Sequence, residues 1–343
     1  MIKKYGFLSL FSLFSACAQV PSSIVSDRLL SPPPAPKDIP PASRTFALEL
    51  INRRRTADIS LEVFVTGRVR TRGEVVSSLK SWHSKVALDV PAFLIRNPKE
   101  GLILFDTGLS SQTPRKANLL MSLVDPAALQ YEASAGQDLL SQLYENGVDP
   151  KEIRWILLSH LHEDHAGMVS AMPQAGVMVS REEWDRWKER WVQKGGGPPA
   201  WAQDIEKRLK LVDFDSKPAF GPMIHAEDAF GDGSVYLTDL PGHTPGNMGA
   251  LVALEGGPVL LTGDAAMVVD NYLDLALPLK PRIEDLGQYW RSLHIIRALS
   301  DSIPRLVVVP GHDLITLRIA QRPDIPIHEG KARKGRSRRK KSP

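Results

Sequence analysis

The sequence predicts a layered α/β fold, and three observations support this prediction. Between Phe46 and Ala320, apolar segments typical of strands alternate with amphipathic segments typical of helices. The 343 residues are 43% hydrophobic and 24% charged, which is ordinary for a globular protein with one large core or two small ones. Polar side chains follow several of the apolar segments, which is where layered α/β folds usually build functional sites.

The predicted elements follow one another in a regular order along the chain. Strands are predicted at 61–69, 90–97, 101–108, 155–158 and 175–180, and later within SVYLTDL, GALVAL, PVLL and PRLVVV. Helices are predicted at 136–147, 182–192 and 288–299. In the first of these helices, Leu139, Leu140 and Leu143 share one face, and Gly147 ends the pattern.

The N-terminus has the features of an export signal, which we assign to residues 1–17. Lys3 and Lys4 precede an apolar run at 5–16 that is too short to span a bilayer as a permanent helix. The run ends in FSAC, which resembles a lipoprotein box in which Cys17 is lipidated, although ordinary cleavage after Ala18 also fits. We therefore expect an exported protein, either periplasmic or anchored to a membrane through Cys17.

Two further segments flank the predicted catalytic domain at 46–320. Residues 18–45 are proline-rich and predict an extended linker. Residues 321–343 predict a disordered basic tail, which ends in KARKGRSRRKKSP, a run of eight basic residues without an acid. This tail is either solvated or docks on anionic lipid. No aromatic residue interrupts it, so we do not expect nucleic-acid binding.

The stretch ILLSHLHEDHAG, at 156–167, gathers three of the nine histidines and two acids within six positions. Similar residues follow three later apolar segments, in PGHTPG, TGDA and PGHD. Because all of them come directly after predicted strands, we expect them to meet at one edge of the sheets. The predicted metal-binding residues are His160, His162, Asp164, His165, His243, Asp264 and His312.

Imidazole and carboxylate ligands favour a pair of divalent ions, for which we expect zinc, although iron, manganese or cobalt also suit them. The spacing assigns His160, His162 and His243 to one ion. Asp164, His165 and His312 would hold the second, and Asp264 has two oxygens with which to bridge both. Two neighbouring ions lower the pKa of a shared water and provide a hydroxide nucleophile. The single cysteine excludes a cysteine-rich zinc site.

The motif SHLHEDHAG resembles the HxHxDH signature of the metallo-β-lactamase superfamily, and FDTG, PGHTPG, TGDA and PGHD match its other motifs in order, over 61–314. Within that superfamily the chain is most similar to the N-acyl-homoserine lactonases. The resemblance implies an αβ/βα four-layer sandwich and the opening of a lactone ring by a metal-bridging hydroxide. It also implies that Asp164 and Asp264 are catalytic, with Asp164 relaying a proton, and that Asp106 orients a ligand loop.

The chain departs from the lactonases at one position. These enzymes often carry a tyrosine three residues after the bridging aspartate, where this chain has Met267, with Tyr272 nearby. The substrate is expected to be a small ester or lactone. A phosphotriesterase, an arylesterase, a thioester hydrolase and a β-lactamase remain alternatives within the superfamily. An envelope-anchored binding protein with structural metals is an alternative of another class.

Trp184, Trp187 and Trp191 form one helical stripe, which predicts a packing face. The alternative is a hydrophobic wall for an acyl chain or a patch resting on lipid. Four histidines lie outside the motifs, and we expect ordinary structural or surface roles for them: His83, His225, His294 and His328.

Overall fold

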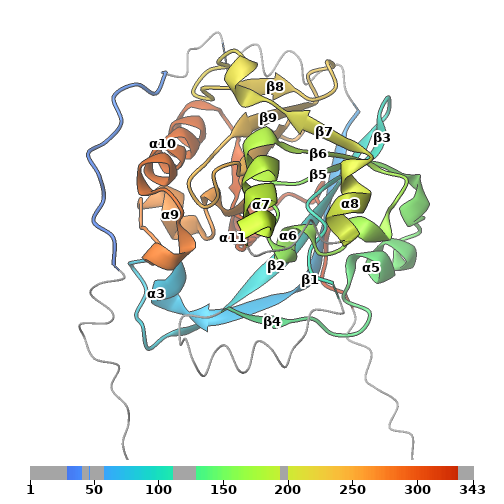
Figure 1. Ribbon diagram of the computed structural model, residues 1–343, viewed down its shortest axis with the longest axis horizontal. Helices are drawn as coiled ribbons and strands as arrows, with labels where there is room; N and C mark the ends of the chain where they lie inside the picture. Colours follow the sequence, from blue (N-terminus) through green and yellow to red (C-terminus); the bar gives the residue numbers. More distant parts are fainter. Residues whose placement is uncertain (1–28, 41–45, 47–57, 111–128, 194–199, 331–343) are drawn as a thin grey trace, which may run out of the picture.

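The structure, a computed structural model, describes residues 29–40, 46, 58–110, 129–193 and 200–330 (Figure 1). The predicted signal peptide, including Cys17, and the basic run at 331–343 lie outside the described residues.

The first sheet has eight strands in the order β13-β1-β2-β3-β5-β6-β7, with β4 paired to β1. Its strands are β1 (Ser60–Arg72), β2 (Lys85–Asn97), β3 (Gly101–Phe105), β4 (Gln130–Glu132), β5 (Ile153–Leu157), β6 (Gly176–Ser180), β7 (Leu209–Val212) and β13 (Ile327–His328). From β3 to β7 neighbouring strands are parallel, whereas β1, β2 and β3 pair antiparallel. The carboxyl ends of β3, β5 and β6 therefore lie at one edge of the sheet.

The second sheet has five strands in the order β12-β11-β10-β9-β8. Its strands are β8 (Ala226–Asp228), β9 (Val235–Asp239), β10 (Met248–Val252), β11 (Val259–Leu261) and β12 (Val307–Val309). All neighbours are antiparallel except β11 and β12, which run parallel. Each predicted strand corresponds to an observed one, so these predictions are confirmed.

Helices cover the outer faces of both sheets. They are α3 (Gly73–Val76), α5 (Leu139–Glu145), α6 (Glu163–Ala166), α7 (Arg181–Gln193), α8 (Ala200–Glu206), α9 (Val269–Leu273), α10 (Leu286–Ser302) and α11 (Ile315–Ile319), with 3₁₀ turns η2 (Pro150–Glu152), η3 (Val169–Ala171), η4 (Phe214–Ser216), η5 (Gly263–Ala265) and η6 (Lys280–Arg282). Figure 1 shows α9 and α10 on one side and α5 and α8 on the other. None of the helices in the described ranges is both long and apolar enough to cross a bilayer.

The side chains of each strand alternate between two apolar layers, because successive residues of a strand point to opposite faces. Along β1, Val63 and Val65 pack between the two sheets, whereas Phe64 packs under the helices of the first sheet. Along β9, Leu237 faces the layer between the sheets and Tyr236 faces α10 and its neighbours. The predicted αβ/βα four-layer sandwich is therefore confirmed.

The predicted end of the domain at residue 320 is wrong. Residues beyond it form β13, in which Ile327 pairs with Val63 and His328 pairs with Phe64 in the parallel sense. The His328 ring stacks on Phe64 with centroids 4.6 Å apart, and Ile325 is buried. A strand of two residues is too short to show a periodic pattern, so it could not be predicted from the sequence. The folded domain reaches at least residue 330.

Part of the predicted linker lies against the domain. Within residues 29–40, Leu30 and Ile39 pack on the apolar layer under α10, and Asp38 forms an ion pair with Arg291 at 2.8 Å. The segment has no helix or strand, as its prolines predict. These residues are therefore attached to the domain surface.

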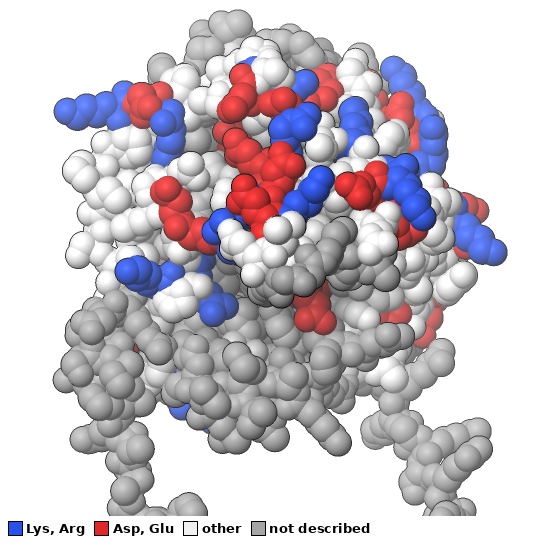
Figure 2. All heavy atoms as spheres, viewed as in Figure 1, with Lys and Arg blue, Asp and Glu red and all other residues white. Residues whose placement is uncertain are grey.

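On the face that carries α7, acidic and basic side chains lie side by side (Figure 2). Arg186 and Arg190 of α7 both pair with Glu284, which lies just before α10. Arg181 pairs with Asp213 at 3.2 Å. These exposed pairs contribute little free energy each, but the two to Glu284 connect α7 to the segment that follows η6.

Candidate metal centre

The structure brings all seven predicted metal-binding side chains together. His160 and His162 follow β5, and α6 adds Asp164 and His165. The other three come from the second sheet and lie after β9, within η5 and after β12: His243, Asp264 and His312. Six of the seven are buried, and His162 is partly exposed. The four histidines outside the sequence motifs also lie outside this cluster: His83, His225, His294 and His328.

Three imidazoles form the first half of the cluster. His160 Nε2 lies 2.9 Å from His162 Nδ1, which lies 3.0 Å from His243 Nε2. Three nitrogens at these separations can face a single ion, since zinc binds imidazole nitrogen at about 2.0–2.1 Å.

Asp164, His165 and His312 form the second half, with ligand atoms within 4.8 Å of one another. Asp264 lies between the halves. Its Oδ2 is 3.3 Å from His243 Nε2, whereas its Oδ1 is 3.4 Å from His165 Nε2 and 3.3 Å from His312 Nε2. One carboxylate thus presents one oxygen to each half.

Several buried atoms at the centre of this cluster have no hydrogen-bond partner among the described residues. They are His165 Nε2, His312 Nε2 and Asp264 Oδ1. Buried polar atoms are rarely left without a partner unless a ligand or ion completes them. Together with the imidazole and carboxylate donor set, these atoms fit a pair of divalent ions.

The opposite nitrogens of the same rings are held by other groups. The Nδ1 atoms of His243 and His312 donate to the backbone oxygens of Arg282, at 2.7 Å, and Asp89, at 2.9 Å. A carbonyl oxygen can only accept, so each ring carries a proton on Nδ1 and turns its Nε2 to the cluster.

The histidines fall into two groups according to the direction in which their surroundings shift the pKa. Burial lowers the pKa of His160, His162 and His243, so these rings are neutral and able to bind a metal. Burial opposes protonation of His165 and His312 as well, but neighbouring carboxylates outweigh it and raise the pKa of both. A cation bound in the second half would therefore displace protons.

Asp106 supports the ligand loop, as the sequence predicts. Its carboxylate accepts from Ser159 N at 2.7 Å and Ser159 Oγ at 2.8 Å, and it lies 2.8 Å from His165 Nδ1. Its φ of +57° is unusual for a residue other than glycine. These three contacts hold the residue in that conformation and orient His165.

Glu183 is a buried carboxylate that the sequence analysis missed. It accepts from Leu161 N at 2.9 Å and from Trp187 Nε1 at 3.0 Å, and burial raises its pKa. Leu161 separates His160 from His162, so Glu183 fixes the first ligand loop against α7. An acid on a charged helix is unremarkable in sequence, which is why no pattern revealed it.

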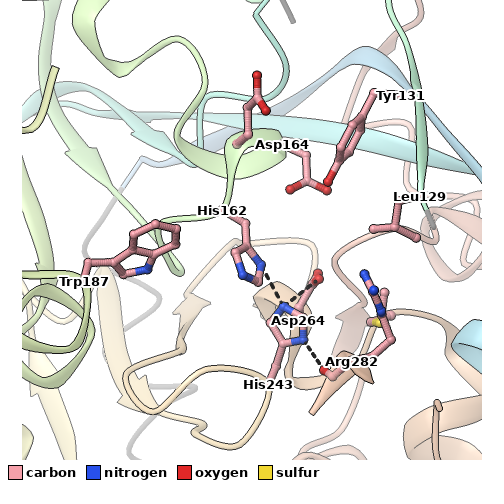
Figure 3. A pocket seen from close by; sticks show the side chains of 10 residues that line it. Leu129, Tyr131, His162, Asp164, Trp187, His243, Asp264 and Arg282 are labelled. Carbon is pink, nitrogen blue, oxygen red and sulfur yellow. Dashed lines mark hydrogen bonds and ion pairs between the residues drawn. The ribbon is translucent and has the colours of Figure 1, made fainter. Parts of the chain in front are cut away.

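A cavity of about 290 Å³ opens onto the cluster (Figure 3). It is lined by Leu129, Tyr131, His162, Glu163, Asp164, Trp187, His243, Asp264, Met267 and Arg282. Met267 lies in this wall, whereas Tyr272 is buried in the layer under α10. The tyrosine in the cavity is Tyr131 of β4, whose hydroxyl points toward Asp164 in Figure 3. Burial and the carboxylates of Asp164 and Asp264 raise its pKa, so it is a neutral phenol.

A second cavity, of about 410 Å³, shares Glu163 and Trp187 with the first. Most of its other lining residues are apolar or small: Ser110, Leu161, Ala166, Gly167, Val169, Ser170 and Trp201. The cavity beside the candidate ligands thus has several ionisable side chains in its lining, whereas the adjoining cavity has Glu163 alone.

The three tryptophans of the α7 stripe have different surroundings. Trp184 and Trp191 are buried in the layer beneath the helices of the first sheet, which confirms the predicted packing face. Trp187 is only partly buried and lines both cavities.

Comparison with known proteins agrees with this geometry. Residues 86–312 match the family model described as metallo-beta-lactamase superfamily. The N-acyl homoserine lactonase AttM of Azorhizobium caulinodans is 29% identical over 269 residues, covering 75% of this chain and 94% of the relative. Its namesake from Agrobacterium fabrum is 28% identical over 274 residues, with the same coverage.

Solved structures share the fold. An N-acyl homoserine lactone hydrolase with N-hexanoyl-L-homoserine bound at its catalytic metal centre superposes with a TM-score of 0.60 at 21% identity, covering 76% of this chain and 95% of that one. The dizinc quorum-quenching lactonase AidC gives a TM-score of 0.51 at 17% identity, covering 75% and 88%. This chain therefore belongs to the metallo-β-lactamase superfamily of hydrolases.

Proposed function

We propose that the protein opens lactone rings, with N-acyl-homoserine lactones as its substrates. The observation that carries this proposal is the pair of adjoining cavities, since four residues of the cluster line one and a single charged residue, Glu163, is in the lining of the other. A substrate with a polar ring and an acyl tail matches both. The lactonase names of its relatives support the same substrate class.

We assign His160, His162 and His243 to one divalent ion and Asp164, His165 and His312 to another, with Asp264 between them. Zinc is the ion that the donor set favours. Two such ions, when bound, would supply Lewis acidity and a water of lowered pKa.

The chain's own residues orient the substrate and move the proton. Trp187 lines both cavities and would pack against the acyl tail, and the neutral phenol of Tyr131 can donate a hydrogen bond into the cavity. The Asp164 carboxylate would carry a proton to the ring oxygen as it leaves, since Asp164 lines the cavity beside the substrate.

The proposal is tested by turnover of a substrate panel by protein that lacks residues 1–17 and whose metal content is quantified. The panel contains N-decanoyl-homoserine lactone, γ-butyrolactone, a phosphotriester, an aryl ester, S-lactoylglutathione and a cephalosporin. We expect lactone opening to exceed every other activity at about two ions per chain. Preference for the phosphotriester or another compound would contradict the substrate class, and two ions with no turnover would favour a binding protein.

Trp187→Ala is expected to raise the KM for N-decanoyl-homoserine lactone about 10-fold and to leave that for γ-butyrolactone unchanged. Without the indole, part of the substrate's acyl tail would be exposed to water. This apolar surface is equivalent to a few methylene groups, and its exposure costs about 1–2 kcal/mol of binding free energy. Steady-state kinetics on both lactones provide the measurement, and Trp187→Phe is the matched control for packing. An unchanged KM for the long chain, with a less stable fold, would leave Trp187 a packing residue.

We also propose that the protein is exported and held at a membrane through Cys17. In a bacterial host, Cys17→Ala is expected to move the protein from the membrane pellet to the soluble periplasmic fraction, because the alanine cannot be lipidated. A variant truncated after residue 330 would show how much the basic tail contributes to membrane retention. Equal membrane retention of wild type and Cys17→Ala would refute the lipid anchor.

A further inference from the structure

Arg282 lines the first cavity, and no ion pair joins it to another of the described residues. It is the only lysine or arginine among the ten residues that line this cavity. Figure 3 shows its side chain beside His243 and Asp264, extending toward Leu129. Its Nε is buried without a hydrogen-bond partner among the described residues, and none of their carboxylates pairs with the guanidinium.

The backbone around Arg282 is fixed independently of its side chain. Its carbonyl oxygen accepts from His243 Nδ1 at 2.7 Å. Glu284 N and Asp285 N both donate to Gly242 O, at 2.8 Å and 3.0 Å. Glu284 is also paired with Arg186 and Arg190 of α7. The turn from which the Arg282 side chain extends is therefore held in place by backbone hydrogen bonds and by the ion pairs of Glu284.

The Arg282 side chain lines the same cavity as His162, His243 and Tyr131. An arginine that is partly buried without a counter-ion is unfavourable unless a ligand pairs with it. The missing partner must carry an oxygen acceptor, and an anionic oxygen suits a guanidinium best.

The proposed reaction creates such an oxygen. Water adds its oxygen to the acyl carbon of the neutral ring, the bond from that carbon to the ring oxygen breaks, and the ring oxygen takes a proton. The acid that forms then releases its proton and leaves a carboxylate. Negative charge grows on the acyl oxygens along this path, so a fixed guanidinium binds the transition state and the product more tightly than the neutral lactone.

Building on the proposed lactone opening, we infer that Arg282 is a further catalytic residue, whose guanidinium donates a charge-assisted hydrogen bond to the acyl oxygen that becomes the product carboxylate. It acts from the wall opposite Trp187, and its side chain plays no part in holding a metal ion. Sequence patterns could not assign this role, because Arg282 lies in a three-residue turn without periodicity.

Arg282→Met tests the inference, with Lys280→Met as the matched control. Lys280 lies in the same turn but is exposed, so its replacement removes one positive charge and leaves the cavity intact. We expect Arg282→Met to lower kcat for N-hexanoyl-homoserine lactone about 100-fold, to change KM less than threefold, and to retain two ions per chain. Calorimetry with N-hexanoyl-homoserine, the ring-opened product, should show about 10-fold weaker binding.

Each other outcome contradicts the inference in a distinct way. A higher KM at unchanged kcat would make Arg282 a ground-state contact only. A lower metal content would show that the substitution acts by displacing His243, whose Nδ1 donates to the Arg282 carbonyl oxygen, and not through contact with the substrate. Unchanged kinetics and product binding, in a chain that opens lactones, would overturn this inference and leave the proposed function standing. A wild-type chain that opens no lactone would overturn both.

Discussion

Asp264→Asn is expected to reduce lactone opening about 1,000-fold or more and to release metal from both halves of the cluster. Asparagine has the same shape, but its amide group offers one oxygen and one donor where Asp264 faces His243 on one side and His165 and His312 on the other. An NH₂ group cannot bind a cation, so the variant would lack the proposed bridge between two ions. A loss of several kcal/mol of transition-state stabilisation corresponds to this rate effect.

The measurement combines metal analysis by mass spectrometry with kinetics on N-decanoyl-homoserine lactone. Asp301→Asn is the control, because Asp301 is 72% exposed and lies at the end of α10. The control should match the wild type in both assays. If Asp264→Asn kept two ions and ordinary turnover, the assignment of Asp264 as the bridging ligand would fail.

Gly242→Ala is expected to lower the free energy of unfolding by about 3 kcal/mol or more. Gly242 has a φ of +126°, and a Cβ there would lie 2.1 Å from Tyr289 N and 2.3 Å from its Cα. Both contacts are to the backbone of α10, which cannot move away as a flexible side chain could. Since His243 is the next residue, the strain would also displace a candidate ligand.

Urea denaturation gives the free energy, and Gly231→Ala is the control. Gly231 also has a positive φ, of +71°, but nothing lies within 4 Å of its Cβ position. Gly231→Ala should lower the free energy of unfolding by about 1–2 kcal/mol, because only the backbone conformation is strained there. Equal destabilisation in the two variants would show that the contact with Tyr289 relaxes at no cost.

The sequence predicted which side chains meet in the candidate metal centre because these residues follow apolar strands. His160, His243, Asp264 and His312 each lie one to four residues beyond a strand whose apolar run is visible in sequence. Parallel pairing of β3, β5 and β6, and of β11 with β12, then places these loops at common edges. The apolar pattern in the sequence and the parallel pairing of the strands therefore indicate the same group of residues.

The walls of the cavity could not be predicted in the same way. Tyr131 lies on a three-residue strand and Arg282 in a 3₁₀ turn, and neither element has a period. Glu183 accepts from Trp187 on its own helix and also from Leu161 N, which lies 22 residues away in the chain. The roles of these residues depend on tertiary packing alone, which no local propensity encodes.

The exposed edge of the first sheet is protected by two short strands from distant parts of the chain. β13 pairs with β1 at Val63 and Phe64, and β4 pairs with β1 from Arg68 to Arg70. An uncovered strand of 13 residues would offer its free backbone groups to another copy of the protein. Because β4 also carries Tyr131 into the cavity, the same hydrogen bonds that guard against aggregation hold a wall of the site. One short strand therefore covers part of a sheet edge and forms part of the cavity wall.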